Sequence, residues 1–144
     1  MNRHQRLIRF IDEVWNKGSV ATAVELIAPT YAIRHDPGDP WDGQTLDREG
    51  FVARLQQSRA PFPDQTFTIL TMTGSGDALV ITWTWQATHL GALGPFAATG
   101  RTIRMSGATV YTFDADDLLT GHWQVTDRLG VYQQLQAGAA ALPG

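Results

Sequence analysis

The chain has 144 residues, of which 43% are hydrophobic, and its formal net charge is −3. This length predicts one domain with ample material for a core, and the scattered Lys and Arg residues argue against a nucleic-acid or anionic-membrane partner. The absence of cysteine excludes disulfides and thiolate metal ligands.

The first ten residues carry Arg3, Arg6 and Arg9 with no apolar run behind them, so we expect no signal peptide. No segment approaches the ~20 apolar residues of a membrane span. We therefore expect a cytoplasmic protein with no membrane partner. The prediction is one domain over residues 1–136 and a flexible tail of small residues over 137–144.

Helical periodicity dominates the first part of the chain. Apolar residues at steps of three and four predict a helix that ends at Gly18. Ser19 is a good N-cap for a second helix, which Pro29 ends. A third helix is expected over residues 47–59.

Between the second and third helices, residues 30–36 predict a short strand, which runs into a loop over 37–43 rich in Pro, Gly and Asp. Trp41 lies in this loop, where an aromatic ring is expected to pack or to contact a ligand.

A period of two then predicts strands over 65–73, 78–89, 101–113 and 118–127. Helices followed by consecutive strands indicate an α+β fold. We expect a curved, mostly antiparallel sheet with three N-terminal helices over one face, which encloses a cone-shaped pocket.

Asp127 ends an alternating stripe that includes Trp123 and Val125, so the pattern predicts a carboxylate aimed into an apolar interior. Burial there raises a carboxyl pKa, which suits a general acid or base. Alternatively, the strand ends one residue earlier and Asp127 caps the following turn.

His35 and His89 also end apolar stripes, and both are candidate catalytic residues, although a lone histidine there can equally be a satisfied core residue. With Asp127 they could form a metal site of two histidines and one carboxylate, which their separate strands neither support nor exclude. The expected substrate-binding residues are the aromatic and apolar side chains Trp41, Trp83, Trp85, Met105, Tyr111 and Trp123.

Other chemistries lack their motifs. Gly74-Ser75-Gly76 lies in a predicted hairpin with no helix behind it, so it is not a phosphate-binding loop. No Gly-x-Ser-x-Gly elbow occurs. Proton transfer is therefore favoured.

Several short motifs carry a family resemblance: His35-Asp36-Pro37, Phe62-Pro63-Asp64, Ala87-Thr88-His89, Thr99-Gly100-Arg101 and the run from Gly121 to Leu135. On these the chain resembles the SnoaL-like polyketide cyclases, in the ester-cyclase branch of the nuclear-transport-factor-two-like superfamily. It departs from the family at Ala87, usually Gly, and at Asp116 and Asp117, usually a Gly-Lys turn.

The resemblance implies an α+β cone and a cofactor-free intramolecular aldol ring closure of a small hydrophobic or aromatic polyketide, with an aspartate at the position of Asp127 as acid and base. It also implies a homodimer, for which the hydroxyl-rich face of Thr82, Thr84, Gln86 and Thr88 is suited. The alternatives are an epoxide hydrolase or ketone isomerase on the same fold, or a non-catalytic module that binds a hydrophobic ligand.

Overall fold

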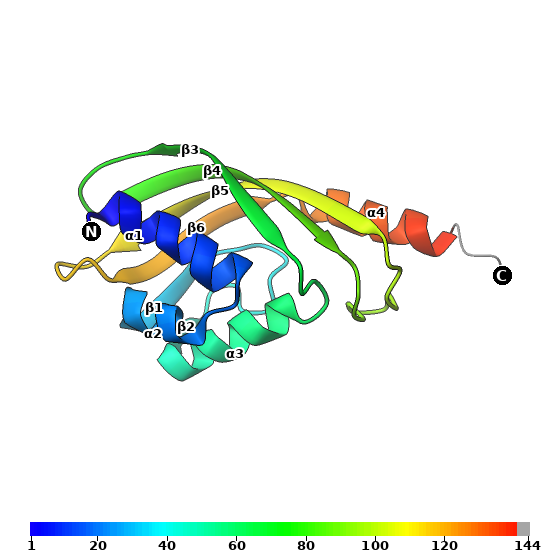
Figure 1. The fold of residues 1–144 in the computed structure, drawn as a ribbon, viewed down its shortest axis with the longest axis horizontal. Helices are drawn as coiled ribbons and strands as arrows, with labels where there is room; N and C mark the ends of the chain where they lie inside the picture. The colour runs from blue at the N-terminus through cyan, green and yellow to red at the C-terminus, as the bar shows by residue number, and fades with distance from the viewer. Residues whose placement is uncertain (141–144) are drawn as a thin grey trace.

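One six-stranded sheet, in the order β2-β1-β6-β5-β4-β3, arches over the N-terminal helices in the computed structural model (Figure 1). The structure describes residues 1–140 and the side chains of residues 1–137. Its elements are α1 (Arg3–Arg9), a π-helical continuation η1 (Phe10–Asn16), α2 (Val20–Leu26), β1 (Ile27–His35), β2 (Thr45–Asp47), α3 (Arg48–Arg59), β3 (Thr66–Thr73), β4 (Ala78–Thr88), β5 (Thr102–Phe113), β6 (Leu119–Thr126) and α4 (Arg128–Ala140).

The three predicted N-terminal helices are present, and each begins where a polar side chain accepts a backbone N–H. Asn2 caps α1, Ser19 caps α2 by accepting from Thr22, and Asp47 caps α3 by accepting from Gly50. Such caps satisfy donors that have no partner within the helix.

The long strands β3 to β6 pair antiparallel, whereas β1 runs parallel to β6. The inward face of β4 is apolar as predicted, with Leu79, Ile81, Trp83 and Trp85 all buried. These side chains and the apolar faces of the helices form the core of the α+β cone.

Two elements were not predicted from the sequence, the short strand β2 and the helix α4. Residues 137–140 complete α4 instead of beginning a tail, and residues 141–144 of the predicted tail lie outside the described residues.

The side chain of Gln134 holds α4 against β5. Its amide accepts from the backbone N–H of Arg104 at 2.8 Å and donates to the carbonyl of Arg104 at 2.7 Å. Gln134 thus pairs with β5 beyond Gly107, where the ladder to β6 has ended.

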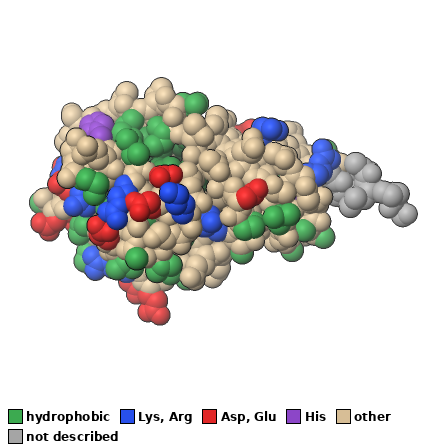
Figure 2. Space-filling model, in the orientation of Figure 1, with side chains coloured by type: hydrophobic (Ala, Val, Ile, Leu, Met, Phe, Trp, Pro, Cys, Tyr) green, Lys and Arg blue, Asp and Glu red, His purple; other side chains and the backbone are tan. Residues whose placement is uncertain are grey.

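Within residues 1–140, no helix is long and apolar enough to cross a membrane. On the face drawn in Figure 2, Lys and Arg side chains lie beside Asp and Glu side chains and form no patch of one sign.

Candidate functional site

Register shifts in two strands decide which side chains enter the cone. In β1 the pairing with β6 shifts between Ile33 and His35. In the β5–β6 ladder it shifts between Thr112 and Phe113, which pair with Gly121 and Leu119. A one-residue shift moves the following side chains to the opposite face.

As a result, the inward positions carry Asp36 from the end of β1 and His122 and Gln124 from β6. The side chain of Asp36 is 1% exposed and that of His122 is 4% exposed. Both sit under the sheet, where an unpaired charge is strongly unfavourable.

These residues form a buried chain of hydrogen bonds that ends at a tyrosine. His122 Nε2 lies 2.9 Å from Asp36 Oδ2, and His122 Nδ1 lies 2.8 Å from the hydroxyl of Tyr31. We call Tyr31, His122 and Asp36 the proton relay. All three side chains are buried.

Asp36 is held as a carboxylate. Burial on its own raises its pKa, but hydrogen bonds from His122 and Arg128 outweigh that effect and lower the pKa to about 2. Arg128 Nη2 lies 2.7 Å from Asp36 Oδ1, and Arg54 Nη2 lies 3.3 Å from Oδ2.

The charge on Asp36 fixes the tautomer of His122. A carboxylate only accepts hydrogen bonds, so Nε2 of His122 carries the proton that it donates to Asp36. Burial lowers the pKa of His122 more than Asp36 raises it. The ring is therefore neutral at pH 7, and its Nδ1 accepts from Tyr31.

A second branch of hydrogen bonds connects Asp36 to the wall of the cone. Gln124 donates to Asp36 at 3.1 Å and accepts from the hydroxyl of Thr109 at 2.7 Å. That hydroxyl accepts from the indole N–H of Trp83 at 2.9 Å. Each donor atom in this branch thus makes at least one hydrogen bond, which links Asp36 to Trp83.

Asp127, the carboxylate predicted to face the interior, lies outside it. Its side chain is exposed, and Oδ1 accepts from the backbone N–H of Gly130 at 2.9 Å, so it caps α4. It borders an open hollow of about 680 Å³ on the outer face of the sheet, beside Thr84 and Ser106. The predicted inward orientation of Asp127 is therefore wrong, because the register shift turned the strand.

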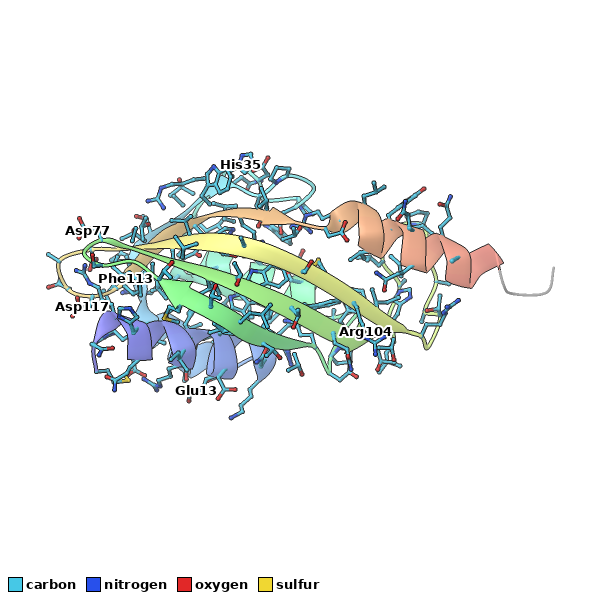
Figure 3. All side chains as sticks on the ribbon, turned by 90° about the horizontal axis from the view of Figure 1, so that it is seen from above. Glu13, His35, Asp77, Arg104, Phe113 and Asp117 are labelled. Carbon is cyan, nitrogen blue, oxygen red and sulfur yellow. The ribbon has the colours of Figure 1, made fainter. Side chains whose placement is uncertain are left out.

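The shift in the β5–β6 ladder places Trp123 on the outer face, and the shift in β1 places His35 there. Their rings stack at 4.5 Å with an interplanar angle of 10°, and Trp123 is 44% exposed. His35, labelled in Figure 3, lies beside β6. The prediction that both side chains point into the cone is therefore wrong.

His89 is buried as expected, at the end of β4 beside Phe62. The backbone N–H of Thr99 donates to its Nδ1 at 3.3 Å. Nδ1 also lies 3.0 Å from the Thr99 hydroxyl. In the tautomer in which Nδ1 accepts, the ring proton is on Nε2, and this buried atom has no partner among the described residues.

The other predicted substrate-binding residues divide by depth. Trp83, Trp85 and Tyr111 are buried under the sheet, and Met105 is half-buried on the same face. Trp41 lies half-buried in the loop after β1.

His35, His89 and Asp127 lie on different faces of the sheet and do not assemble the metal triad. Across the part of the chain that the structure describes, no group of three His, Asp or Glu residues is placed to hold a metal ion.

Sequence reasoning missed Asp36 and His122 as site residues. His122 fell on the polar face of an alternating strand, and Asp36 stood next to His35 in a motif in which the histidine was favoured. The only available signal was that each immediately adjoins a residue on the predicted inward face.

Comparison with known proteins agrees with the fold. The family model for the SnoaL-like polyketide cyclases matches residues 5–135. A candidate polyketide cyclase from Acidithiobacillus ferrooxidans is 51% identical, with a TM-score of 0.89, over 94% of this chain and 95% of that one.

IdmH, a candidate polyketide cyclase from Streptomyces antibioticus, is 26% identical, with a TM-score of 0.79, over 94% of this chain and 99% of that one. Among curated proteins, none matches this chain. The match to the family model over residues 5–135 shows that this chain belongs to the SnoaL-like polyketide cyclase family.

Proposed function

We propose that the protein catalyses a cofactor-free intramolecular aldol ring closure of a polyketide-type small molecule, and that the proton relay carries the proton transfers. The observation behind this proposal is the buried hydrogen-bond chain from Tyr31 through His122 to Asp36, with steps of 2.8 and 2.9 Å. The order of groups is that of a catalytic triad, with a tyrosine hydroxyl in the first place.

The reaction needs one proton removed and one returned. Tyr31 passes its hydroxyl proton to Nδ1 of His122, and the phenolate oxygen takes a proton from a substrate carbon between two carbonyls. The resulting enolate carbon bonds to a second carbonyl carbon, whose oxygen becomes an alkoxide. The Tyr31 hydroxyl then protonates this alkoxide, and His122 returns the first proton to Tyr31.

Each residue of the relay has a separate role in this scheme. Burial raises the pKa of Tyr31 well above its usual value, so the hydroxyl is protonated at rest. Asp36 stabilises the imidazolium that forms on His122, which lowers the free-energy cost of the first transfer.

We propose that the inward aromatic side chains of Trp83, Trp85 and Tyr111 contact a flat hydrophobic substrate, with Met105 beside them and Trp41 at the loop. His89 would donate its unpartnered Nε2 proton to a substrate oxygen. A planar aromatic ligand is then expected to quench tryptophan fluorescence on binding.

The function is tested by deuterium exchange at the activated carbon of methyl benzoylacetate, followed by NMR above the buffer background. Tyr31→Phe and His122→Gln are expected to lower the exchange rate roughly 100-fold or more, the scale of lost acid–base catalysis. A β-keto ester with a second ketone within reach of the activated carbon reports ring closure itself, and exchange without closure would indicate an isomerase.

Asp127→Asn separates the relay from the carboxylate predicted from the sequence. Asn caps a helix about as well as Asp, so the melting temperature should stay close to that of the parent protein. If the relay is the catalytic group, exchange stays within about twofold of the parent rate. A folded Asp127→Asn protein that has lost exchange, beside active relay variants, would assign the chemistry to Asp127 instead.

We also propose a homodimer through the outer face of the sheet. Thr82 and Thr84 of β4 pair with Ala108 and Ser106 of β5 on this face. Its small and hydroxyl side chains present few charges to a second copy.

A further inference from the structure

Arg54 is an arginine on α3 that is almost fully buried, with 5% of its surface exposed. Its Nη2 lies 3.3 Å from Asp36 Oδ2 and 3.1 Å from Asp39 Oδ2. All the hydrogen bonds from the guanidinium to carboxylates therefore come from one nitrogen, Nη2.

The other two nitrogens are buried and have no acceptor. Nε and Nη1 of Arg54 find no hydrogen-bond partner among the described residues. Buried polar groups in folded proteins are almost always paired, and donors on a charged group are the least favourable to leave unpaired. These donors are therefore placed for an acceptor that none of the described residues supplies.

The charges around Arg54 show what kind of acceptor fits. Arg54 and Arg128 each contact both Asp36 and Asp39. The two arginines carry two positive charges and the two carboxylates carry two negative charges. The cluster is already neutral, so a full anion is not required to balance it. A carbonyl or enol oxygen supplies the missing acceptor without adding charge in the ground state.

Two indole rings flank the guanidinium and lead to the surface. The guanidinium carbon lies 5.3 Å from the ring centroid of Trp15 and 6.0 Å from that of Trp41, and both side chains are half-buried. A planar unsaturated ligand that packs against these rings would bring its oxygen to the guanidinium.

We propose that Arg54 binds a carbonyl or enol oxygen of a planar aromatic ketone through Nε and Nη1, between Trp15 and Trp41. This inference deepens the proposed function and rests on it for the reaction. The same contact would stabilise the negative charge that an oxygen gains as the ketone becomes an enolate.

Binding of non-reacting ligands tests the inference apart from turnover. The probe is 2-acetyl-1-naphthol, and 2-ethylnaphthalene is its counterpart without oxygen. Arg54→Lys retains the charge beside Asp36 but loses the planar donors. It is expected to weaken binding of 2-acetyl-1-naphthol about tenfold or more and to change binding of 2-ethylnaphthalene less than about twofold.

Arg59→Lys is the matched control, because Arg59 is on the same helix and donates to the backbone carbonyls of Trp15 and Pro63. It should leave both affinities unchanged. Equal affinity of the parent protein and Arg54→Lys for the ketone would overturn the inference. An equal loss for both ligands would also overturn it, since that result shows a disturbed pocket.

A third ligand, 1-hydroxy-2-naphthoate, tests the charge argument. Binding of this anion to the parent protein about tenfold more tightly than the ketone would overturn the assignment of a neutral oxygen. If the ketone binds through Arg54 while Tyr31→Phe keeps full exchange activity, the proposed relay fails and the Arg54 site stands.

Discussion

Two of the buried ionisable groups of the relay, His122 and Asp36, couple the stability of the fold to pH. His122 has a lowered pKa in the folded protein, so below pH 6.5 the unfolded chain binds a proton that the folded chain does not. Asp36 has its pKa lowered from 3.8 to about 2, so its contribution is complete above pH 4 and is lost as the pH falls towards 2. Acid therefore destabilises the protein in two stages.

We expect the melting temperature of the parent protein to fall from pH 6.5 downwards, and to fall again below pH 4, where the contribution of Asp36, roughly 2–3 kcal/mol in total, is lost progressively towards pH 2. His122→Gln should flatten the first stage because it removes the titrating ring. Calorimetry between pH 8 and 3 makes the comparison. A parent melting temperature that stays constant between pH 7 and 5 would contradict the neutral, buried state of His122.

At the scale of elements, the sequence predicted where strands and helices lie better than which way their side chains point. The inward stripe of β4 was predicted correctly because its alternation is uninterrupted over eleven residues. In β1 after Ile33 and in β6 after Gly121, the predicted side-chain orientations were wrong. A register shift exchanges the two faces of a strand but leaves the alternation of residue types in the sequence intact.

Gly121 makes the shift in β6 sterically feasible. A Cβ atom at this position would lie 2.3 Å from the carbonyl oxygen of Ala32 on β1. Gly121→Ala should therefore destabilise the protein by roughly 1–3 kcal/mol, as overpacking against backbone does. Because the strand can respond by turning, relay activity should fall as well.

Urea unfolding of Gly121→Ala measures this effect, with Ser106→Ala on the exposed face of β5 as the control. If Gly121→Ala has the stability and the exchange activity of the parent protein, this glycine does not determine the orientation of His122.

At the scale of the whole molecule, the corrected orientation of β6 adds apolar side chains to the proposed dimer face. Trp123 and Val125 are each 44% exposed on the outer face, next to Val110 and Ala108 of β5 in the ladder. An exposed aromatic among apolar neighbours is typical of an interface anchor.

Sedimentation velocity at micromolar concentration should show a dimer of the parent protein and a monomer of Trp123→Glu, because the charge would be buried unpaired at the interface. The relay lies under the opposite face of the sheet, so exchange activity should persist in the monomer. Sedimentation of the parent protein as a monomer would rule out the dimer.

The contact of Gln134 with β5 also bears on how the protein avoids aggregation. Beyond Gly107 the edge of β5 carries backbone donors and acceptors that no strand satisfies, and such an edge is a template on which another chain can add a strand. The side-chain amide of Gln134 hydrogen-bonds to the N–H and the carbonyl of Arg104, as a neighbouring strand would.

Gln134→Ala should therefore scatter more light than the parent protein during incubation below the melting temperature. Gln133→Ala, a change at an exposed residue of the same helix, should not. A single side-chain amide would then protect this end of β5 from pairing with a strand of another molecule.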